Sequence, residues 1–296
     1  MKTVPPRECL ICENNNLETI SAIISGFLLE RIWNNSINDK TYICHCKNCG
    51  FAFYAMRPNE KEMAKLYENY RDENYQEQRQ KYDSWYTKSI NDVINNDQMS
   101  YKERQEYLGT FLNKYIDTTN IKSVLDYGGN TGLHIPMIFS NAKKYVFDIS
   151  GVKTVEGVQG FNNLHDAKKQ QYDFVMCIAL LEHVSEPNTI LNQLKELVAK
   201  NGYLYICVPF DSPFYKHKHS KIQFLFNKHF SFKVILDRFL RDRKNPFIMH
   251  EHINYFTENS VKKMLERRGL TVLDFVIHQS KGPLGYGESI HVLAKT

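Results

Sequence analysis

The sequence has no hydrophobic run long enough for a membrane-spanning helix, which takes about 18 uninterrupted apolar residues. The most apolar early stretch, residues 20–29, is shorter and is interrupted by Ser21, Ser25 and Gly26. Residues 1–6, MKTVPP, lack the apolar core of a signal peptide. These absences argue against a membrane-spanning or secreted protein and predict a cytoplasmic location.

A large excess of one charge is also missing. The 296 residues carry 38 Lys and Arg against 33 Asp and Glu, a formal net charge of +5. That is well short of the basic tail typical of nucleic-acid-binding proteins, so we expect no nucleic acid as a partner. The balance permits an anionic substrate without requiring one, and it says nothing about the oligomeric state.

Cysteine is too scarce for a disulfide-rich fold, with seven residues unevenly placed. Five of them precede residue 50, and four of these form two CxxC pairs: Cys9, Cys12, Cys46 and Cys49. Two such pairs complete a closed tetrahedral site of four thiolates, the arrangement that structural Zn²⁺ takes. The pattern therefore predicts a small zinc-ribbon-like lobe over residues 1–75.

The spacing of these pairs leaves two points open. The 33 residues between Cys12 and Cys46 exceed the usual spacing of about 15–20, which predicts an inserted hairpin or helix. Cys44 and His45 are alternative ligands. The alternative to a metal site is a set of free thiols in a loop-rich lobe.

After this lobe, residues 76–120 are polar with helical spacing of the apolar residues, and they predict a helical linker or cover. Over residues 121–296 strands and helices alternate, which predicts a parallel sheet covered on both faces. The expected strands are 123–127, 144–148, 174–178, 203–208, 271–278 and 289–294, with helices between the early ones. The last two strands are expected to form a terminal antiparallel hairpin, because three glycines and one proline lie between them.

The loop after the first of these strands is rich in glycine but lacks a dinucleotide fingerprint. Residues 124–132 read VLDYGGNTG, and a G-x-G-x-x-G motif would need glycines where Asn130 and Leu133 stand. Asp126 lies inside the motif, where a carboxylate suits a cationic or amino-bearing ligand better than a pyrophosphate. Asp148 ends the next apolar run and can accept two hydrogen bonds from a ribose diol. These features indicate S-adenosylmethionine (SAM) rather than NAD; the alternative is a flavodoxin-like domain.

Three motifs resemble those of class I SAM-dependent methyltransferases, and the resemblance covers about residues 105–296. Residues 124–132 resemble the first motif, with Asn130 where a glycine is usual. Residues 172–184, YDFVMCIALLEHV, and 201–209, NGYLYICVP, resemble the motifs of the fourth and fifth strands. The resemblance implies a Rossmann-like, seven-stranded α/β fold. It also implies SAM contacts from Asp126, Gly128, Gly129, Asn130 and Gly132 at the methionine part, Asp148 at the ribose, and residues 162–164 with Ala179 near the adenine.

Catalysis of methyl transfer needs mainly alignment of the acceptor and removal of its proton, because the methyl group of SAM is already activated. His183, in the pair Glu182-His183 after the fourth strand, is one candidate base. Residues 248–256, IMHEHINYF, resemble a segment of sugar C-methyltransferases, which also begin with a four-cysteine zinc lobe. By that resemblance Glu251 and His252 are catalytic candidates, with His252 as the base. The alternative is that Glu182-His183, and likewise His250 and His252, have only a structural role and hold their loops in place.

The acceptor is less determined than the cofactor. Sugar C-methyltransferases continue with a further C-terminal domain, whereas this sequence ends at Thr296, which favours O-methylation of a sugar or polysaccharide precursor. Residues 211–249 are rich in Lys, Arg and aromatic side chains, which suits a lid over an anionic, small or glycan-linked acceptor such as a nucleotide sugar. The alternative is a helical pair with a solvated basic face. Sugar C-methylation, RNA methylation and SAM binding without catalysis stay open.

Overall fold

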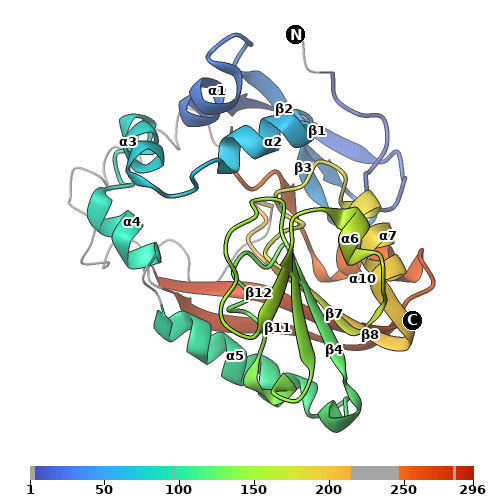
Figure 1. Ribbon diagram of the computed structural model, residues 1–296. Coiled ribbons are helices and arrows are strands. Elements are labelled where there is room, and N and C mark those ends of the chain that lie inside the picture. Colours follow the sequence, from blue (N-terminus) through green and yellow to red (C-terminus); the bar gives the residue numbers. More distant parts are fainter. Residues whose placement is uncertain (1–3, 96–97, 215–246, 283–284) are drawn as a thin grey trace.

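The larger of two β-sheets comes from residues 123–295 (Figure 1). The computed structural model describes residues 4–95, 98–214, 247–282 and 285–296. The strands of this sheet are β4 (Ser123–Tyr127), β5 (Lys143–Phe147), β6 (Val158–Phe161), β7 (Tyr172–Ile178), β8 (Val198–Pro209), β11 (Thr271–Gly282) and β12 (Gly285–Lys295).

The order of these seven strands is β11-β12-β8-β7-β4-β5-β6. Strands β4 to β8 pair in parallel, and β12 runs antiparallel to both β8 and β11. The chain leaves β4 toward one edge and returns to the other side of β4 as β7, which creates a switch point between these two strands. The predicted Rossmann-like sheet and terminal hairpin are confirmed, and β6 is the strand that the sequence pattern did not reveal.

Helices cover both faces of this sheet, so its central strands are apolar on both sides. Neighbouring residues of β4 belong to different hydrophobic clusters: Val124 packs with α5 (Gln98–Leu112), while Leu125 packs with α7 (Pro187–Leu197) and α10 (Glu258–Glu266). The continuous apolar runs that predicted buried parallel strands therefore reflect this two-sided burial. The remaining short elements are η1 (Thr118–Asn120), η2 (Met137–Phe139) and α6 (Leu164–Ala167).

One expectation about the connections is wrong. The segment between β4 and β5 contains no α-helix but only the single 3-10 turn η2, and described residues 148–157 between β5 and β6 contain no helix. Gly132 has a φ of 86°, and Pro136 precedes η2, so the chain cannot continue as a regular helix there. The backbone of both connections therefore stays irregular at the carboxyl ends of the strands.

The smaller sheet has the order β10-β3-β2-β1-β9. Its strands are β1 (Leu17–Ile24), β2 (Lys40–Cys46), β3 (Ala52–Tyr54), β9 (Ile248–Met249) and β10 (Asn254–Tyr255). Helix α1 (Gly26–Trp33) connects β1 to β2, so the expected insertion between the CxxC pairs is a strand pair with a helix. Strands β9 and β10 close both edges of the lobe although they follow β8 in the chain. The division at residues 75 and 120 stays a prediction.

Three further helices lie between the two sheets in the chain: α2 (Glu60–Tyr67), α3 (Glu73–Tyr82) and α4 (Lys88–Asn95). Asn59 caps α2 through a capping box, and Asp72 accepts a hydrogen bond from the backbone N–H of Tyr75 at the start of α3. The polar composition of α3 hides a buried face formed by Tyr75 and Arg79. Among the described residues, no helix is long and apolar enough to cross a membrane.

Candidate active site

The glycine loop after β4 is shaped by close contacts around Asp126. A Cβ atom at Gly129 would lie 2.2 Å from Cγ of Asp126, so no side chain fits at this position. Gly128 has a φ of 75°, in the left-handed region that glycine adopts readily. Asn130 has a φ of 51°, and asparagine is the residue that best tolerates this region after glycine. Asn130 therefore adopts the left-handed backbone that a glycine would adopt readily at this position.

Asp126 itself is fully buried at the end of β4. Burial, with a smaller contribution from the negative charge of Asp148, raises its pKa to about 8. Neither carboxylate oxygen of Asp126 has a hydrogen-bond partner in the part of the chain that the structure describes. A buried carboxyl group without partners is costly, so this position fits a ligand that donates hydrogen bonds or carries positive charge.

Asp148 follows β5 and faces the same loop. Its carboxylate accepts hydrogen bonds from the backbone N–H groups of Asn130 and Ser150, both at 2.9 Å. An open cavity of about 340 Å³ begins here and is lined by Asn130, Asp148, Gly151, Val152, Phe161 and Asn162, among others. The structure thus brings together Asp126, Asp148 and the predicted loop residues, with Asn162 on the far side.

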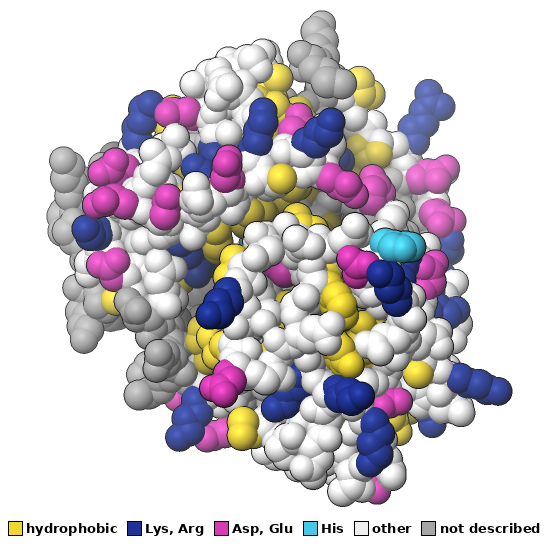
Figure 2. Space-filling model, viewed as in Figure 1, with side chains coloured by type: hydrophobic (Ala, Val, Ile, Leu, Met, Phe, Trp, Pro, Cys, Tyr) yellow, Lys and Arg dark blue, Asp and Glu magenta, His cyan; other side chains and the backbone are white. Residues whose placement is uncertain are grey.

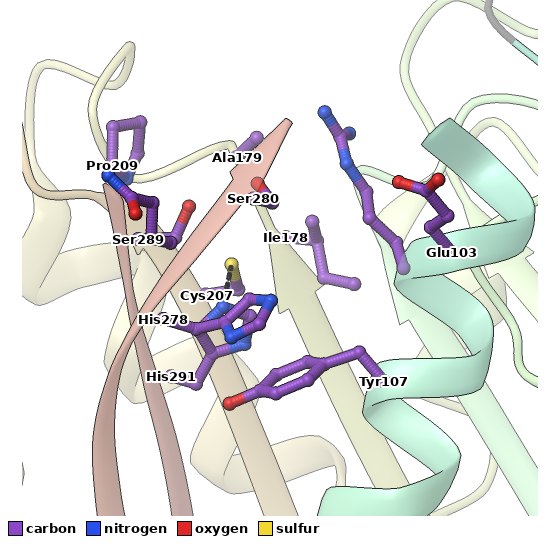
Figure 3. A pocket seen from close by; sticks show the side chains of 12 residues that line it. Glu103, Tyr107, Ile178, Ala179, Cys207, Pro209, His278, Ser280, Ser289 and His291 are labelled. Carbon is purple, nitrogen blue, oxygen red and sulfur yellow. Dashed lines mark hydrogen bonds between the residues drawn. The ribbon is translucent and has the colours of Figure 1, made fainter. Parts of the chain in front are cut away.

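Ala179 lies elsewhere, in a second cavity of about 280 Å³ at the ends of β7 and β8 (Figure 3). The ring of Tyr107 from α5 stacks on that of His278 from β11 with centroids 3.6 Å apart. Arg104 also lines this cavity. Ala179 has a φ of 51°, which is strained for alanine and marks the turn out of β7 as constrained. The two cavities lie on either side of the switch point.

The predicted catalytic residues meet beyond the end of β7. One ligand atom each of Glu182, His183 and His252 lies within 4.8 Å of the others. His183 Nε2 is 3.9 Å from Glu182 Oε1, and His252 Nδ1 is 2.8 Å from Asp211 Oδ2. The rings of His183 and His252 have centroids 4.8 Å apart. Residues distant in the sequence therefore form one cluster.

The surroundings shift the pKa values of this cluster in different directions. Burial raises the pKa of Glu182 to about 7 and lowers that of His183 to about 4. Burial alone would lower the pKa of His252, but the hydrogen bond and charge of Asp211 outweigh it and raise the pKa to about 9. Such divergent shifts within one cluster are typical of functional sites.

Glu251 points away from this cluster toward α3. Its Oε2 accepts a hydrogen bond from Arg79 Nη1 at 2.6 Å, and its Oε1 accepts one from the hydroxyl of Tyr75. Burial would raise the pKa of Glu251, but the charge of Arg79 and the Tyr75 hydrogen bond lower it to about 2. The backbone carbonyl of Glu251 still lies 3.0 Å from His183 Nδ1. Glu251 thus connects α3 to the histidine cluster.

Arg57, which follows β3, fixes the loop after β7 through several hydrogen bonds. It donates hydrogen bonds to the carbonyl oxygens of Val184 (2.8 Å) and Ser185 (3.0 Å) and to Oδ1 of Asn254 (2.8 Å). Asn254 in turn donates to the carbonyl oxygens of Leu181 and Val184, both at 2.7 Å. The loop that carries Glu182 and His183 is therefore fixed to the N-terminal lobe and to β10.

The four predicted cysteine ligands also meet. Sγ of Cys9 lies 3.6 Å from that of Cys49, Sγ of Cys12 lies 3.5 Å from that of Cys46, and the four sulfur atoms lie within 4.8 Å of one another. The interaction with Cys49 lowers the pKa of Cys9 to about 6. The alternative ligands lie outside this group. Cys44 contacts Thr19 Oγ1 at 3.9 Å, and His45 stacks on Phe214.

Several site residues were not predicted from the sequence: Arg57, Tyr67, Tyr75, Arg79 and Asp211. Tyr75 and Arg79 are four residues apart on α3, a spacing that could have indicated a shared buried face. Most of the predicted lid, residues 215–246, lies outside the described residues. The two ends of that insertion meet, because the rings of Phe214 and Phe247 stack with centroids 5.5 Å apart.

A family model described as a methyltransferase domain matches residues 100–274, more than half of the chain. The chain belongs to this methyltransferase family. Its cofactor is SAM, and the buried Asp126, the side-chain-free Gly129 and Asp148 fit that molecule. No curated protein has a sequence similar enough to match.

Among solved structures, the methyltransferase resembles magnesium protoporphyrin IX methyltransferase from Synechocystis PCC 6803 with bound SAH. Identity is 15%, the match covers 70% of this chain and 86% of the other, and the TM-score is 0.43. It also resembles the N-methyltransferase NodS from Bradyrhizobium japonicum at 12% identity, with 69% and 99% of the two chains covered and a TM-score of 0.40. A putative methyltransferase from Bacillus halodurans matches at 14% identity, with 63% and 97% covered and a TM-score of 0.40.

Proposed function

We propose that this methyltransferase acts on a small or carbohydrate-linked acceptor that binds between the N-terminal lobe and the ends of β7 and β8, with O-methylation favoured. The observation that carries this proposal is the convergence of Glu182, His183 and His252 at that junction. Hydrophobic side chains gather along the hollow between the lobe and the larger domain in Figure 2. The acceptor would therefore meet an apolar wall and a polar reactive cluster.

Aromatic side chains beside the cluster suit a sugar ring. Tyr67 and Tyr75 each meet Tyr70 edge to face, with centroids 5.1 and 5.2 Å apart. The ring of Tyr70 remains 38% exposed, and the guanidinium of Arg71 lies 4.6 Å from its centroid. A partly exposed aromatic ring beside a cation matches a ring-shaped acceptor with an anionic group, as in a nucleotide sugar.

The geometry supports the following catalytic roles. His183 and His252 would contact the reacting group of the acceptor. His183, which is uncharged at neutral pH, would take its proton, and the protonated His252 would stabilise its deprotonated form. The acceptor atom would then attack the sulfonium methyl in line, which leaves S-adenosylhomocysteine. Glu251 would act as a positioning residue, because its carboxylate is occupied by Tyr75 and Arg79.

SAM would lie across the switch point. Asp148 would bind the ribose and Asp126 the positively charged methionine part, with Gly128, Gly129, Asn130 and Gly132 forming the turn beneath. The methionine carboxylate would extend toward the cavity that Ala179 and Arg104 line, where the guanidinium offers an opposite charge.

The four-cysteine cluster would hold a structural zinc ion. Tetrahedral Zn–S bonds of about 2.3 Å place sulfur atoms about 3.8 Å apart, close to the separations in this protein. The backbone N–H of Ile11 lies 3.4 Å from Cys9 Sγ, and the carbonyl of Cys49 accepts a hydrogen bond from Thr257 Oγ1 at 2.8 Å. The ion would fasten the lobe against the start of α10, where Thr257 is the N-cap.

The test of this function is a methyl-transfer assay with radiolabelled SAM and a panel of nucleotide sugars, sugar phosphates and RNA. We expect labelled product from a nucleotide sugar and loss of most activity in His183→Ala and His252→Ala, with Lys168→Ala on the distant surface as the matched control. The chemical shift of the transferred methyl in the product distinguishes an O-methyl from a C-methyl group. Transfer to RNA alone, or to no acceptor in the panel, would contradict the proposal.

A further inference from the structure

Glu182 is a carboxylate without a partner at the centre of the proposed acceptor site. It is only 1% exposed, and neither side-chain oxygen has a hydrogen-bond partner within the described ranges. Its backbone is fixed, because the N–H groups of Ile253 and Asn254 donate to its carbonyl oxygen at 2.9 and 3.0 Å. Burial of a lone carboxylate is costly, so a group that compensates it should bind here.

His183 presents a free nitrogen to that carboxylate. Its Nδ1 lies 3.0 Å from the carbonyl oxygen of Glu251 and 2.8 Å from the hydroxyl of Tyr67. A carbonyl can only accept, so Nδ1 carries the proton and Nε2, 3.9 Å from Glu182 Oε1, has the lone pair. Metal-binding histidines are usually oriented in this way, through a hydrogen bond from the other ring nitrogen to a carbonyl or carboxylate.

His252 shows the second common form of the same arrangement. Its Nδ1 lies 2.8 Å from Asp211 Oδ2, a carboxylate–histidine contact of the kind that orients metal ligands. The ring is about one-third exposed, on the side from which an acceptor would approach. Two imidazoles and one carboxylate therefore converge with partners that hold each ring in place.

We propose that Glu182, His183 and His252 bind a divalent cation that accepts nitrogen and oxygen ligands, such as Mn²⁺. Two imidazoles and one carboxylate leave coordination positions open, which suits an ion that also binds substrate. The ion would take two neighbouring oxygens of the acceptor, a diol or a hydroxyl beside a carbonyl. With the ion bound, the histidines would act as its ligands and not as bases. The ion would act as a Lewis acid on the bound acceptor hydroxyl, whose proton would pass to water. The identification of the acceptor as a diol or a hydroxyl beside a carbonyl rests on the proposed function, whereas the binding of the ion to the three side chains does not.

The cation site differs in kind from the four-cysteine cluster, and the difference makes it testable. Thiolates select soft metals, whereas imidazole and carboxylate accept Mn²⁺. The experiment is a titration with Mn²⁺ of the full chain loaded with a single equivalent of Zn²⁺ for the four cysteines, followed by electron paramagnetic resonance and calorimetry. We expect saturable binding of one Mn²⁺ per chain and a loss of affinity of about tenfold or more in Glu182→Gln and His183→Ala. Glu196→Gln, a surface carboxylate paired with Lys168, is the matched control and should bind Mn²⁺ as the unaltered protein does.

Two further measurements keep the result interpretable. Glu182→Gln should retain SAM binding and a cooperative thermal transition, and if it does not, His252→Gln on the exposed side replaces it. Saturable Mn²⁺ binding without methylation of any acceptor would support the cation site and contradict the proposed function. Absent or non-saturable Mn²⁺ binding would overturn the cation site, even if the histidines prove essential for methyl transfer. The same holds if the Glu182 and His252 variants bind Mn²⁺ as tightly as the unaltered protein.

Discussion

The proposed cofactor site and the proposed acceptor site of this methyltransferase are built in different ways. Asp126, Asn130, Asp148 and Asn162 come from one short stretch over strands β4 to β6, and the contact between Asn130 and Asp148 spans 18 residues. The acceptor cluster combines α2, α3, the loop after β7 and the segment around His252; the contact between Arg79 and Glu251 spans 172 residues. One site is local in sequence, whereas the other exists only once the lobe has docked. Four predictions test this contrast.

The largest effect should follow loss of the four-cysteine site. The double variant Cys9→Ser, Cys49→Ser should lose zinc, because two of the four ligands are removed. Binding of structural zinc contributes an apparent free energy of about 10–16 kcal/mol to the folding of small domains. The lobe and with it the acceptor site should unfold, while SAM binding by the local site stays detectable. Metal analysis and calorimetry with SAM check this. Cys44→Ser, in β2 but outside the cluster, should keep its zinc; full zinc content in the double variant would refute the site.

The next largest effect concerns the connection between α3 and the acceptor site. Glu251→Gln removes the closer of the two buried carboxylates that pair with Arg79, the other being Asp83 at 3.7 Å. Breaking a buried ion pair typically costs about 3–5 kcal/mol of unfolding free energy, and Asp83 places the expected loss at the lower end of this range. Urea denaturation should show this loss, whereas Lys168→Gln in the exposed pair with Glu196 should cost about 1 kcal/mol or less. Equal losses in the two variants would show that the buried pair does not hold the lobe.

A smaller effect is expected within the local site. Asp148→Ala removes the acceptor of the ribose hydroxyls, and a hydrogen bond to a charged group contributes about 1.5–3 kcal/mol. SAM affinity measured by calorimetry should fall about tenfold to a hundredfold. Asp166→Ala, within α6 and in an exposed ion pair with Lys169, is the control. An unchanged affinity would remove Asp148 from the cofactor site.

The smallest effect is a pH dependence. The pKa of Asp126 is about 8 in the cofactor-free protein, so the carboxyl is protonated at neutral pH and must release its proton to bind a cationic ligand. SAM affinity should therefore rise about tenfold per pH unit below this pKa and level off above it. The contribution of Asp126 to folding stability changes with pH in the opposite direction. The raised pKa means that the folded state binds the extra proton, and its stabilising effect is lost as the pH rises toward about 8. Calorimetry across pH should show both trends, and Asp126→Asn should show neither.

The same contrast explains what the sequence could predict. Strand β4 begins and ends where the apolar run 123–127 predicted, because a buried parallel strand leaves a local signature. The loop residues Asp126, Gly128 and Asn130 follow from that strand. Strand β6 was missed because its residues are half-buried or exposed, so their pattern resembles a loop.

The residues of the proposed acceptor site were harder to predict from sequence patterns than those of the glycine loop. His183 was a candidate because it follows the fourth strand, whereas Glu251 and His252 were candidates through resemblance. No local pattern indicated which of them meet. Glu182, whose side chain is the most deeply buried of the cluster, was considered only together with its neighbour. Tyr67, Arg79 and Asp211 reach the site through contacts that span the chain, which periodicity cannot reveal. Their roles in catalysis stay predictions.

Strands β9 and β10 have a consequence for how the protein is made. Strand β1 pairs with β9 and β3 pairs with β10, so both edges of the lobe sheet are completed by residues 248–255. A ribosome adds about 5–20 residues per second, so these edges wait on the order of ten seconds or more for their partners. Open edges pair readily with other chains. Nascent chains and fragments that stop before residue 248 are therefore the forms of this protein that depend most on chaperones.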